Sequence, residues 1–185
     1  MGEAHVPNPV MLVTAAFSRY PEALDWAQQH LEEAFGPVEL TSATLEFDQT
    51  RYYEPDMGPG LKKRFFAFGG LVAPDSLPKI KRRTNDLESE LARSGAYPVP
   101  RPLNLDPGLL SLGKFQLATT KDQSHRIYLG EGIYAEVTLR YQAGCFEPWP
   151  WTYADYRQPA VLVFLQEARD LYRRRVRDML GEVRG

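Results

Sequence analysis

Residues 11–37 read MLVTAAFSRYPEALDWAQQHLEEAFGP and set the pattern for the first half of the chain. The apolar run 11–17 is long enough for a buried strand and too short for a helix. Pro21 suits a first helical turn, apolar residues then recur at helical spacing, and Gly36-Pro37 ends the segment. This stretch therefore predicts a strand followed by a helix.

The same alternation of strand and helix patterns continues along the chain. Sequence patterns predict strands over 41–47, 62–72 and 109–119 and a helix over 78–93, with the proline-rich segment 96–108 extended or turning. The order β-α-β-β-α-β is that of a split βαβ unit. We therefore expect an α+β fold with a ferredoxin-like (βαββαβ) core.

A β-hairpin and a C-terminal helix are predicted to extend this core. Residues 125–129 and 133–141 both alternate, and Gly130-Glu131-Gly132 joins them with glycines that tolerate positive φ. The aromatic segment 144–156 is expected to be an ordered loop. Residues 159–180 carry an apolar stripe at helical spacing. The whole chain, 1–185, is expected to form a single domain.

The composition bounds the environment and the partners. A net charge of −2 gives no overall attraction for nucleic acid, so nucleic-acid binding is unlikely and would need a local patch. The lone Cys145 indicates a reducing compartment. The sequence has no apolar run of membrane-spanning length, and its start lacks a secretory pattern. We expect a cytoplasmic protein that does not bind membranes.

Several chemistries lack their sequence motifs. The chain has neither a phosphate loop of the GxxxxGK[ST] type nor a GxGxxG cradle nor a GxSxG nucleophile elbow. One cysteine and three scattered histidines do not supply zinc-ligand spacing. No metal site is predicted, and the cofactor and the oligomeric state stay unknown.

Strand alternation in the hairpin predicts a polar face. Apolar side chains are expected to pack on the core at Ile127, Leu129, Ile133, Ala135, Val137 and Leu139. The opposite face would then present Arg126, Tyr128, Tyr134, Glu136 and Arg140. Fixed guanidinium groups suit an anionic ligand such as a phosphate or carboxylate. The alternative is a solvated face whose side chains serve only cross-strand pairing.

Other candidates flank this hairpin. His125 could transfer protons near pH 7, oriented by Asp122 or Glu136, although Asp122 could equally cap a turn. Lys114 and Lys121 would add positive charge. Asn104 and Asp106 lie in an Asn-Leu-Asp-Pro-Gly run that is typical of a turn and could also face a ligand.

Three stretches together resemble a known family. They are LDPGLLSLGKFQLATTKDQSHRIYLGEGIYAEVTLRY at 105–141, Tyr52-Tyr53-Glu54 with Met57-Gly58, and Trp151 to Tyr156. The chain resembles an uncharacterised prokaryotic family catalogued as domain of unknown function 4416. The resemblance covers nearly the whole chain and implies a single domain of about this length. It implies no activity, substrate or catalytic residue.

Two functions follow as hypotheses. The first is a cytoplasmic enzyme or binding protein for a small anionic ligand, phosphorylated or nucleotide-like, held by Arg126 and Arg140 with His125 moving protons. The second is a non-enzymatic RNA-binding or protein-interaction module, because ferredoxin-like sheets can stack bases on exposed aromatics. The sequence lacks the RNP1-like run that the standard version of such a module carries.

Overall fold

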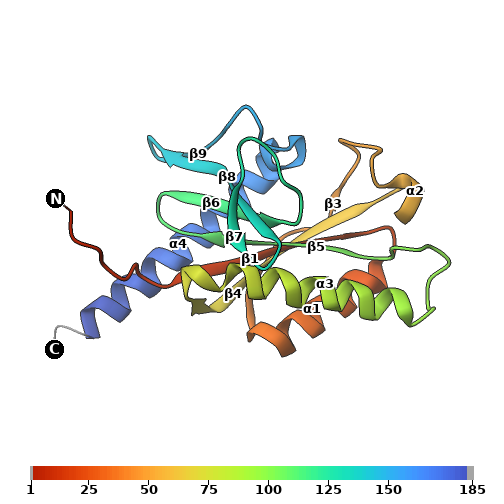
Figure 1. Cartoon of the computed structure of the whole chain (residues 1–185), viewed down its shortest axis with the longest axis horizontal. Helices are drawn as coiled ribbons and strands as arrows, with labels where there is room; N and C mark the ends of the chain where they lie inside the picture. The colour runs from red at the N-terminus through yellow and green to blue at the C-terminus, as the bar shows by residue number, and fades with distance from the viewer. Residues whose placement is uncertain (1, 183–185) are drawn as a thin grey trace.

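The computed structural model describes residues 2–182 and has a mixed α+β fold (Figure 1). Within that range four helices and nine strands form, in the order β1 (Val10–Ser18), α1 (Pro21–Phe35), β2 (Val38–Thr41), β3 (Leu45–Glu46), α2 (Glu54–Met57), β4 (Lys62–Val72), α3 (Leu77–Arg93), β5 (Asn104–Leu110), β6 (Lys114–Thr119), β7 (Ile127–Gly130), β8 (Ile133–Gln142), β9 (Cys145–Pro148) and α4 (Pro159–Glu182). Short 3₁₀ turns lie at Pro74–Ser76 and Ala154–Arg157. The α+β prediction is confirmed.

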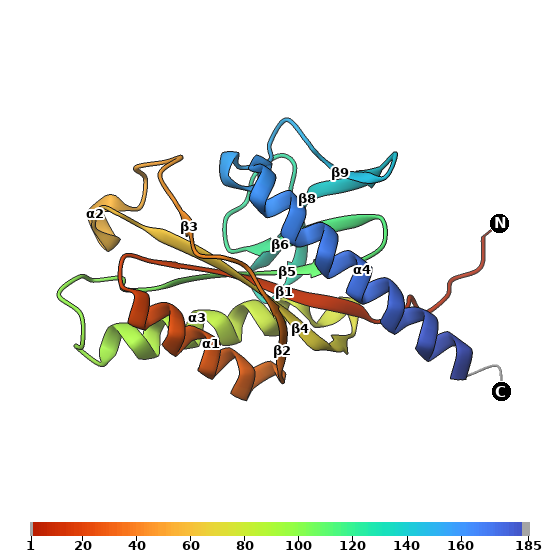
Figure 2. The same ribbon diagram turned by 180° about the vertical axis from the view of Figure 1, so that it is seen from behind.

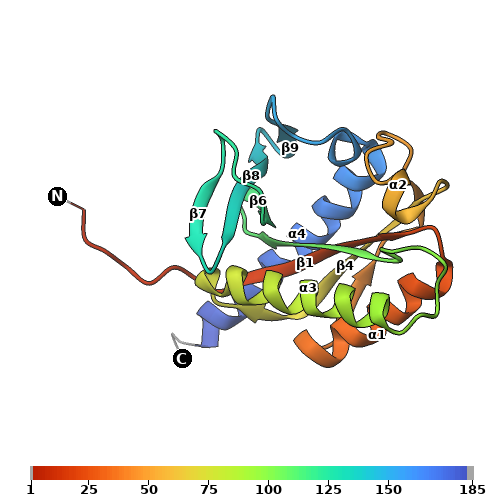
Figure 3. The same ribbon diagram turned by 45° about the vertical axis from the view of Figure 1, so that its right-hand side comes forward.

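The strands form one antiparallel sheet in the order β2-β4-β1-β5-β6-β8-β7, with β3 beside β4 and β9 beside β8. Helices α1 and α3 lie side by side against one face (Figure 3). Helix α4 crosses the opposite face (Figure 2). None of the helices in the described range is long and apolar enough to cross a membrane.

Strand β1 divides the hydrophobic core into two layers, because successive side chains of a strand point to opposite faces. Leu12 and Ala16 pack toward α1 and α3. Met11 and Val13 pack toward α4. Every residue of β1 is buried. The strand–helix pattern of residues 11–37 thus forms as predicted, and it lies at the centre of the fold.

The predicted strand at 109–119 is two strands, and the predicted turn at 104–108 is part of the first. Residues 104–108 pair with β1, and Pro107 lies opposite Thr14. Strand β6 pairs with β5 only from Gly108 onward, where Gly108 lies opposite Leu117. A proline lacks a backbone N–H and is tolerated where one side of a strand has no partner. The sheet therefore forks between β5 and β6.

The predicted hairpin forms, but its side chains depart from strict alternation. Opposite Phe115 and Gln116 the pairing of β8 passes from Leu139 to Val137, which leaves Thr138 as an extra residue. Such a bulge reverses the side-chain alternation beyond it. Glu136 and Thr138 are both buried, whereas Val137 is half-buried.

The predicted burial of the first hairpin strand is wrong. Ile127 and Leu129 are exposed, and Arg126, which was expected on the outer polar face, is buried. Strand β7 is the last strand of the sheet, and neither core cluster of the described chain includes Ile127 or Leu129. The turn itself behaves as predicted, since Gly130, Glu131 and Gly132 all have positive φ.

Candidate functional site

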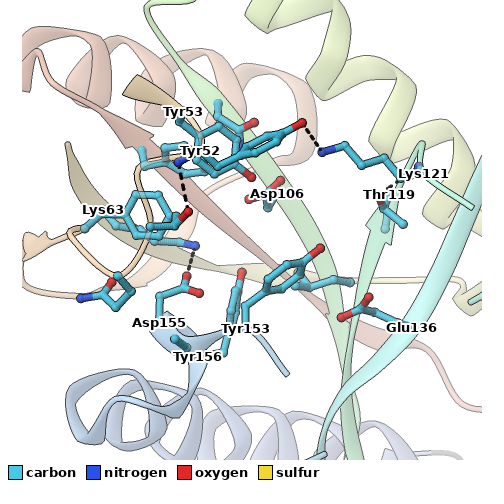
Figure 4. A pocket seen from close by; sticks show the side chains of 18 of the residues that line it. Tyr52, Tyr53, Lys63, Asp106, Thr119, Lys121, Glu136, Tyr153, Asp155 and Tyr156 are labelled. Atoms are coloured by element: carbon cyan, nitrogen blue, oxygen red, sulfur yellow. Dashed lines mark hydrogen bonds and ion pairs between the residues drawn. The ribbon is translucent and has the colours of Figure 1, made fainter. Parts of the chain in front are cut away.

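A pocket of about 450 Å³ opens at the fork between β5 and β6 (Figure 4). Its walls come from the ends of β1, β4 and β5, from α3, from residues 117–123, and from two irregular segments at 47–53 and 153–156. The carboxylate of Asp106 lies between the Tyr52–Tyr53 side and the Tyr153–Tyr156 side. The described lining includes eight charged residues: Lys63, Lys81, Arg101, Lys121, Arg126, Asp106, Glu136 and Asp155.

One wall is a buried ion pair between Arg126 and Glu136. Their side chains are each 1% exposed, and Arg126 Nε donates to Glu136 Oε2 at 2.9 Å. The guanidinium also donates to the carbonyl of Lys121 at 3.0 Å and to Tyr153 Oη at 2.6 Å. A buried charge that loses its partner is costly. These contacts therefore fix the loop after β6 and the segment at 153–156 against β8.

His125 lies next to this pair but not on the pocket surface. Its Nε2 is 3.1 Å from Glu136 Oε2, and its ring stacks on Trp151 with centroids 5.2 Å apart. It is absent from the pocket lining, whereas Arg126 and Glu136 belong to it. Glu136 thus contacts His125, as predicted for an orienting carboxylate, and separates the imidazole from the cavity. Asp122 is exposed and makes no side-chain hydrogen bond or ion pair within residues 2–182.

A second buried ion pair joins Lys63 and Asp155. Lys63 Nζ donates to Asp155 Oδ2 at 2.5 Å, and both side chains are at most 10% exposed. The ammonium also lies over aromatic rings, of which Tyr156 is at 4.6 Å and Phe47 at 5.0 Å. Ring faces attract a cation, more strongly when it is desolvated. This pair anchors the start of β4 to the segment that precedes α4.

The floor of the pocket is built around Lys81 and Asp106. Lys81 Nζ donates to the carbonyl of Leu105 at 2.7 Å and lies 3.9 Å from Asp106 Oδ1, too far for a hydrogen bond. Behind it, burial raises the pKa of the Glu88 carboxyl, opposed by the charges of Lys81 and Arg101. Asp106 itself accepts no side-chain hydrogen bond among the described residues, although it is more than two-thirds buried.

Three tyrosines supply phenol groups to the walls. Burial raises the pKa of Tyr53, Tyr153 and Tyr156, and the negative charge of Asp106 raises it further in all three. These phenols therefore stay protonated at neutral pH and act as hydrogen-bond donors. Within the described chain, the buried Tyr156 Oη and Asn104 Nδ2 have no hydrogen-bond partner.

Two cations lie nearer to solvent than the others. The Arg101 side chain is 36% exposed and pairs with Glu88 at 3.1 Å. Lys121 is exposed, and its Nζ contacts Tyr52 Oη at 3.2 Å. Lys121 forms no ion pair with a carboxylate in the part of the chain that the structure describes. Its charge is therefore available to a ligand.

Comparison with protein families places the chain in one of them. A family model described as "Domain of unknown function (DUF4416)" matches residues 8–172. The chain belongs to the DUF4416 family. No curated protein matches it significantly. The match covers every residue of the DUF4416 pocket, and it carries no ligand or activity with it.

The structure separates the residues predicted for the DUF4416 site into two groups. Five of them line the pocket and a sixth, His125, lies next to it. The five are Asn104, Asp106, Lys121, Arg126 and Glu136. The structure places the others elsewhere. Arg140 pairs with Glu147 at 2.8 Å, the ring of Tyr128 lies against that of Tyr134 at a tilted angle, and Lys114 is exposed at the start of β6. The bulge at Thr138 explains why Arg140 is separated from Glu136, since the two residues lie on opposite sides of it.

The lining residues that the predicted site did not include are numerous, and among them are Tyr53, Lys63, Lys81, Arg101, Tyr153 and Asp155. Two of them carried a signal. Lys63 shares its strand face with Phe65 and Ala67, which points a lysine toward the core. Lys81 follows Leu77 by four residues, which places it on the buried stripe of α3. For the other four, loop positions give no periodicity to follow.

Metal coordination finds no support in the described DUF4416 chain. No group of three or more His, Cys, Asp or Glu side chains within residues 2–182 is placed so that it could hold a metal ion.

Proposed function

We propose that the pocket at the β5–β6 fork binds a small anionic ligand. The observation that carries the proposal is the exposed ammonium of Lys121, which contacts a phenol and no carboxylate in the described chain. Arg101 lies on the same pocket and is partly exposed. An ammonium and a planar guanidinium are the usual partners of phosphate and carboxylate groups.

The charge balance of the lining supports an anion. The described lining carries five cationic side chains against three carboxylates. Lys63 and Arg126 each have a buried carboxylate partner, so their charges are largely neutralised in place. The remaining cations are Lys81, Arg101 and Lys121. Two carboxylates oppose them, Asp106 in the lining and Glu88 behind it, which pairs with Arg101 at 3.1 Å and lies 4.0 Å from Lys81, so the surplus is one positive charge. A cleft of one sign within low-dielectric walls attracts ions of the other sign.

The size of the pocket supports a small molecule. Ligand sites commonly enclose about 300–1,000 Å³ and combine apolar walls with a few polar groups. The volume of about 450 Å³ lies in this range, and Phe17, Phe47 and Tyr53 supply apolar wall. We therefore propose a phosphorylated or nucleotide-like ligand.

We propose that groups lining the cavity, and not His125, act on the bound ligand. Glu136 separates the imidazole from the pocket. The phenols of Tyr53, Tyr153 and Tyr156 face the pocket and stay protonated at neutral pH, since burial raises their pKa. They can therefore donate hydrogen bonds to the ligand, whereas a raised pKa makes them weak general acids.

The RNA-binding alternative gains no specific support. A base-stacking module needs an open sheet face with exposed aromatics. In the described chain, α1 and α3 pack on one face of β1 and β4, and α4 packs on the other.

We also propose that the first half of the chain is a ferredoxin-like core within a single cytoplasmic domain. The sheet order β2-β4-β1-β5, with α1 and α3 on one face, supports this assignment. The strands follow one another as β-α-β-β-α-β once the two-residue β3 and the short α2 are set aside. The free thiol of Cys145 is consistent with a reducing compartment.

The test is a binding screen by thermal shift, followed by calorimetry. Inorganic phosphate, pyrophosphate, sugar phosphates and nucleotides are added to the wild type, to Lys121→Ala and to Lys79→Ala. A ligand at 100 times its Kd stabilises the native state by about 2.7 kcal/mol, which raises the Tm by roughly 5–10 °C for a chain of this length. We expect such a shift in the wild type and in Lys79→Ala, whose lysine is exposed on α3 away from the pocket.

Lys121→Ala should weaken binding about tenfold, as expected when a charge-assisted contact is lost. The proposal fails if no phosphorylated compound shifts the wild type, or if Lys121→Ala and Lys79→Ala behave alike.

A further inference from the structure

We infer that the ligand is a sugar phosphate, whose hydroxyl groups bind to a floor made by Asp106, Asn104 and Tyr156. This inference rests on the proposed function, because the phosphate end of the ligand would bind at the cationic site proposed above. It names the class of ligand that the proposed anion-binding site would take.

The carboxylate of Asp106 is the first observation. It lies in the middle of the pocket, between the two tyrosine walls (Figure 4). Its nearest cation, Lys81 Nζ, is 3.9 Å away and already donates to the carbonyl of Leu105. A carboxylate in such a position has acceptor sites directed at the cavity and no side-chain donor in the described chain to fill them. The ligand must therefore bring donors to it.

Two buried donors beside this carboxylate are the second observation. Asn104 is 3% exposed; its Oδ1 accepts from Arg101, and its Nδ2 has no partner in the described chain. Tyr156 is 1% exposed, and its Oη also lacks a partner there. Both residues line the pocket. Buried polar groups are almost always satisfied in native proteins, so these two require an acceptor on a ligand or an ordered water.

The mixture of acceptor and donors selects the chemistry of the group that binds there. A second phosphate would offer acceptors to Asn104 and Tyr156 and would be repelled by Asp106. A protonated amine would offer donors to Asp106 and to Tyr156 Oη, but no acceptor to the amide nitrogen of Asn104. A hydroxyl both donates and accepts, so neighbouring sugar hydroxyls can satisfy all three residues together.

The position of the floor fits the two ends of such a ligand. Asp106 and Asn104 lie on β5 beyond Gly108, where the two strands part, whereas Lys121 follows β6 on the other arm of the fork. A sugar phosphate would then point its phosphate toward Lys121 and its hydroxyls toward β5, where Arg101 contacts Asn104. The pocket volume of about 450 Å³ accepts a molecule of this size.

Calorimetry with three probes tests the inference on the whole chain. Ribose 5-phosphate, glucose 6-phosphate and inorganic phosphate are titrated into the wild type, Asp106→Asn and Asp86→Asn. Asp86 is an exposed carboxylate on α3 outside the pocket and serves as the charge-matched control. We expect the wild type to bind at least one sugar phosphate about tenfold more tightly than inorganic phosphate, because hydroxyls add contacts to Asp106.

Asp106→Asn should affect sugar phosphates and inorganic phosphate differently. Loss of the carboxylate should weaken sugar-phosphate binding about tenfold, since charge-assisted hydrogen bonds are lost. It should leave inorganic phosphate bound as tightly as before or more tightly, since a repelling charge is removed. Asp86→Asn should change neither. If Asp106→Asn unfolds the chain, Tyr156→Phe replaces it, with a several-fold loss for the sugar phosphate alone.

Each failure has its own signature. If the wild type binds inorganic phosphate and sugar phosphates equally, or if Asp106→Asn tightens both, the hydroxyl-binding floor is refuted while the anion site stands. If none of the three probes binds, the anion site fails and the inference fails with it.

Discussion

Replacement of Asp155 by asparagine tests whether the Lys63–Asp155 ion pair holds the pocket together. Asparagine keeps the size and an oxygen acceptor and removes only the charge. Lys63 Nζ and Asp155 Oδ2 are 2.5 Å apart, with side-chain exposures of 4% and 10%. The ammonium of Lys63 would remain among aromatic rings without its counter-charge.

The expected cost follows from this burial. Removal of one partner of a buried pair destabilises a protein by about 3–5 kcal/mol, because the remaining charge stays desolvated. For a chain of this length each kcal/mol lowers the Tm by roughly 2–4 °C, so we expect a loss of roughly 6–20 °C. Lys63→Met with Asp155→Leu removes both charges and should recover most of the loss.

The neighbouring residue supplies a matched control. Lys62 pairs with Glu46 at 3.6 Å, and both side chains are largely exposed. Exposed pairs contribute at most about 1 kcal/mol, so Glu46→Gln should change the free energy of unfolding by less than that. Urea unfolding followed by circular dichroism gives all four values. Equal costs for Asp155→Asn and Glu46→Gln would refute the buried-pair reasoning, as would a double variant less stable than Asp155→Asn.

Three further outcomes are expected. Burial raises the pKa of Tyr156 well above 10, so its contribution to stability is complete below about pH 10 and is lost as the pH rises further. Urea midpoints between pH 8 and 12 should fall less steeply in Tyr156→Phe. Gly108→Ala should cost about 1–3 kcal/mol, because the new Cβ would lie 2.5 Å from the carbonyl oxygen of Gln116, whereas Gly69→Ala meets only a flexible side chain and should cost less. Glu136→Ala should destabilise the chain by about 3–5 kcal/mol in urea unfolding, because it leaves a buried guanidinium unpaired.

Local patterns predicted the elements whose neighbours are near in sequence. The β1–α1 unit and the turn at Gly130–Gly132 form as expected, because apolar spacing and glycine backbone freedom act over a few residues. The contact between Glu136 and His125 could also be predicted, since the two residues belong to one hairpin segment. The sequence pattern alone was sufficient for these features.

Contacts between residues distant in sequence determine the strand and side-chain arrangements that local sequence patterns did not predict. Pro107 indicated a turn, yet β1 accepts it as a strand residue because its other side has no partner. The extra residue Thr138 reverses the faces of β8 and sends Glu136 inward, and no local pattern marks such a bulge. Asp155 meets a lysine 92 positions away. The pocket is therefore a product of topology that periodicity cannot reveal.

The central place of β1 has a consequence for synthesis on the ribosome. Residues 10–18 are translated first, but their two neighbours, residues 62–72 and 104–110, leave the exit tunnel much later. In the interval this mostly apolar strand has two unpaired edges, an arrangement prone to mispairing with other chains. Because its contacts are distant in sequence, this strand can complete its pairing only after residue 110 has emerged.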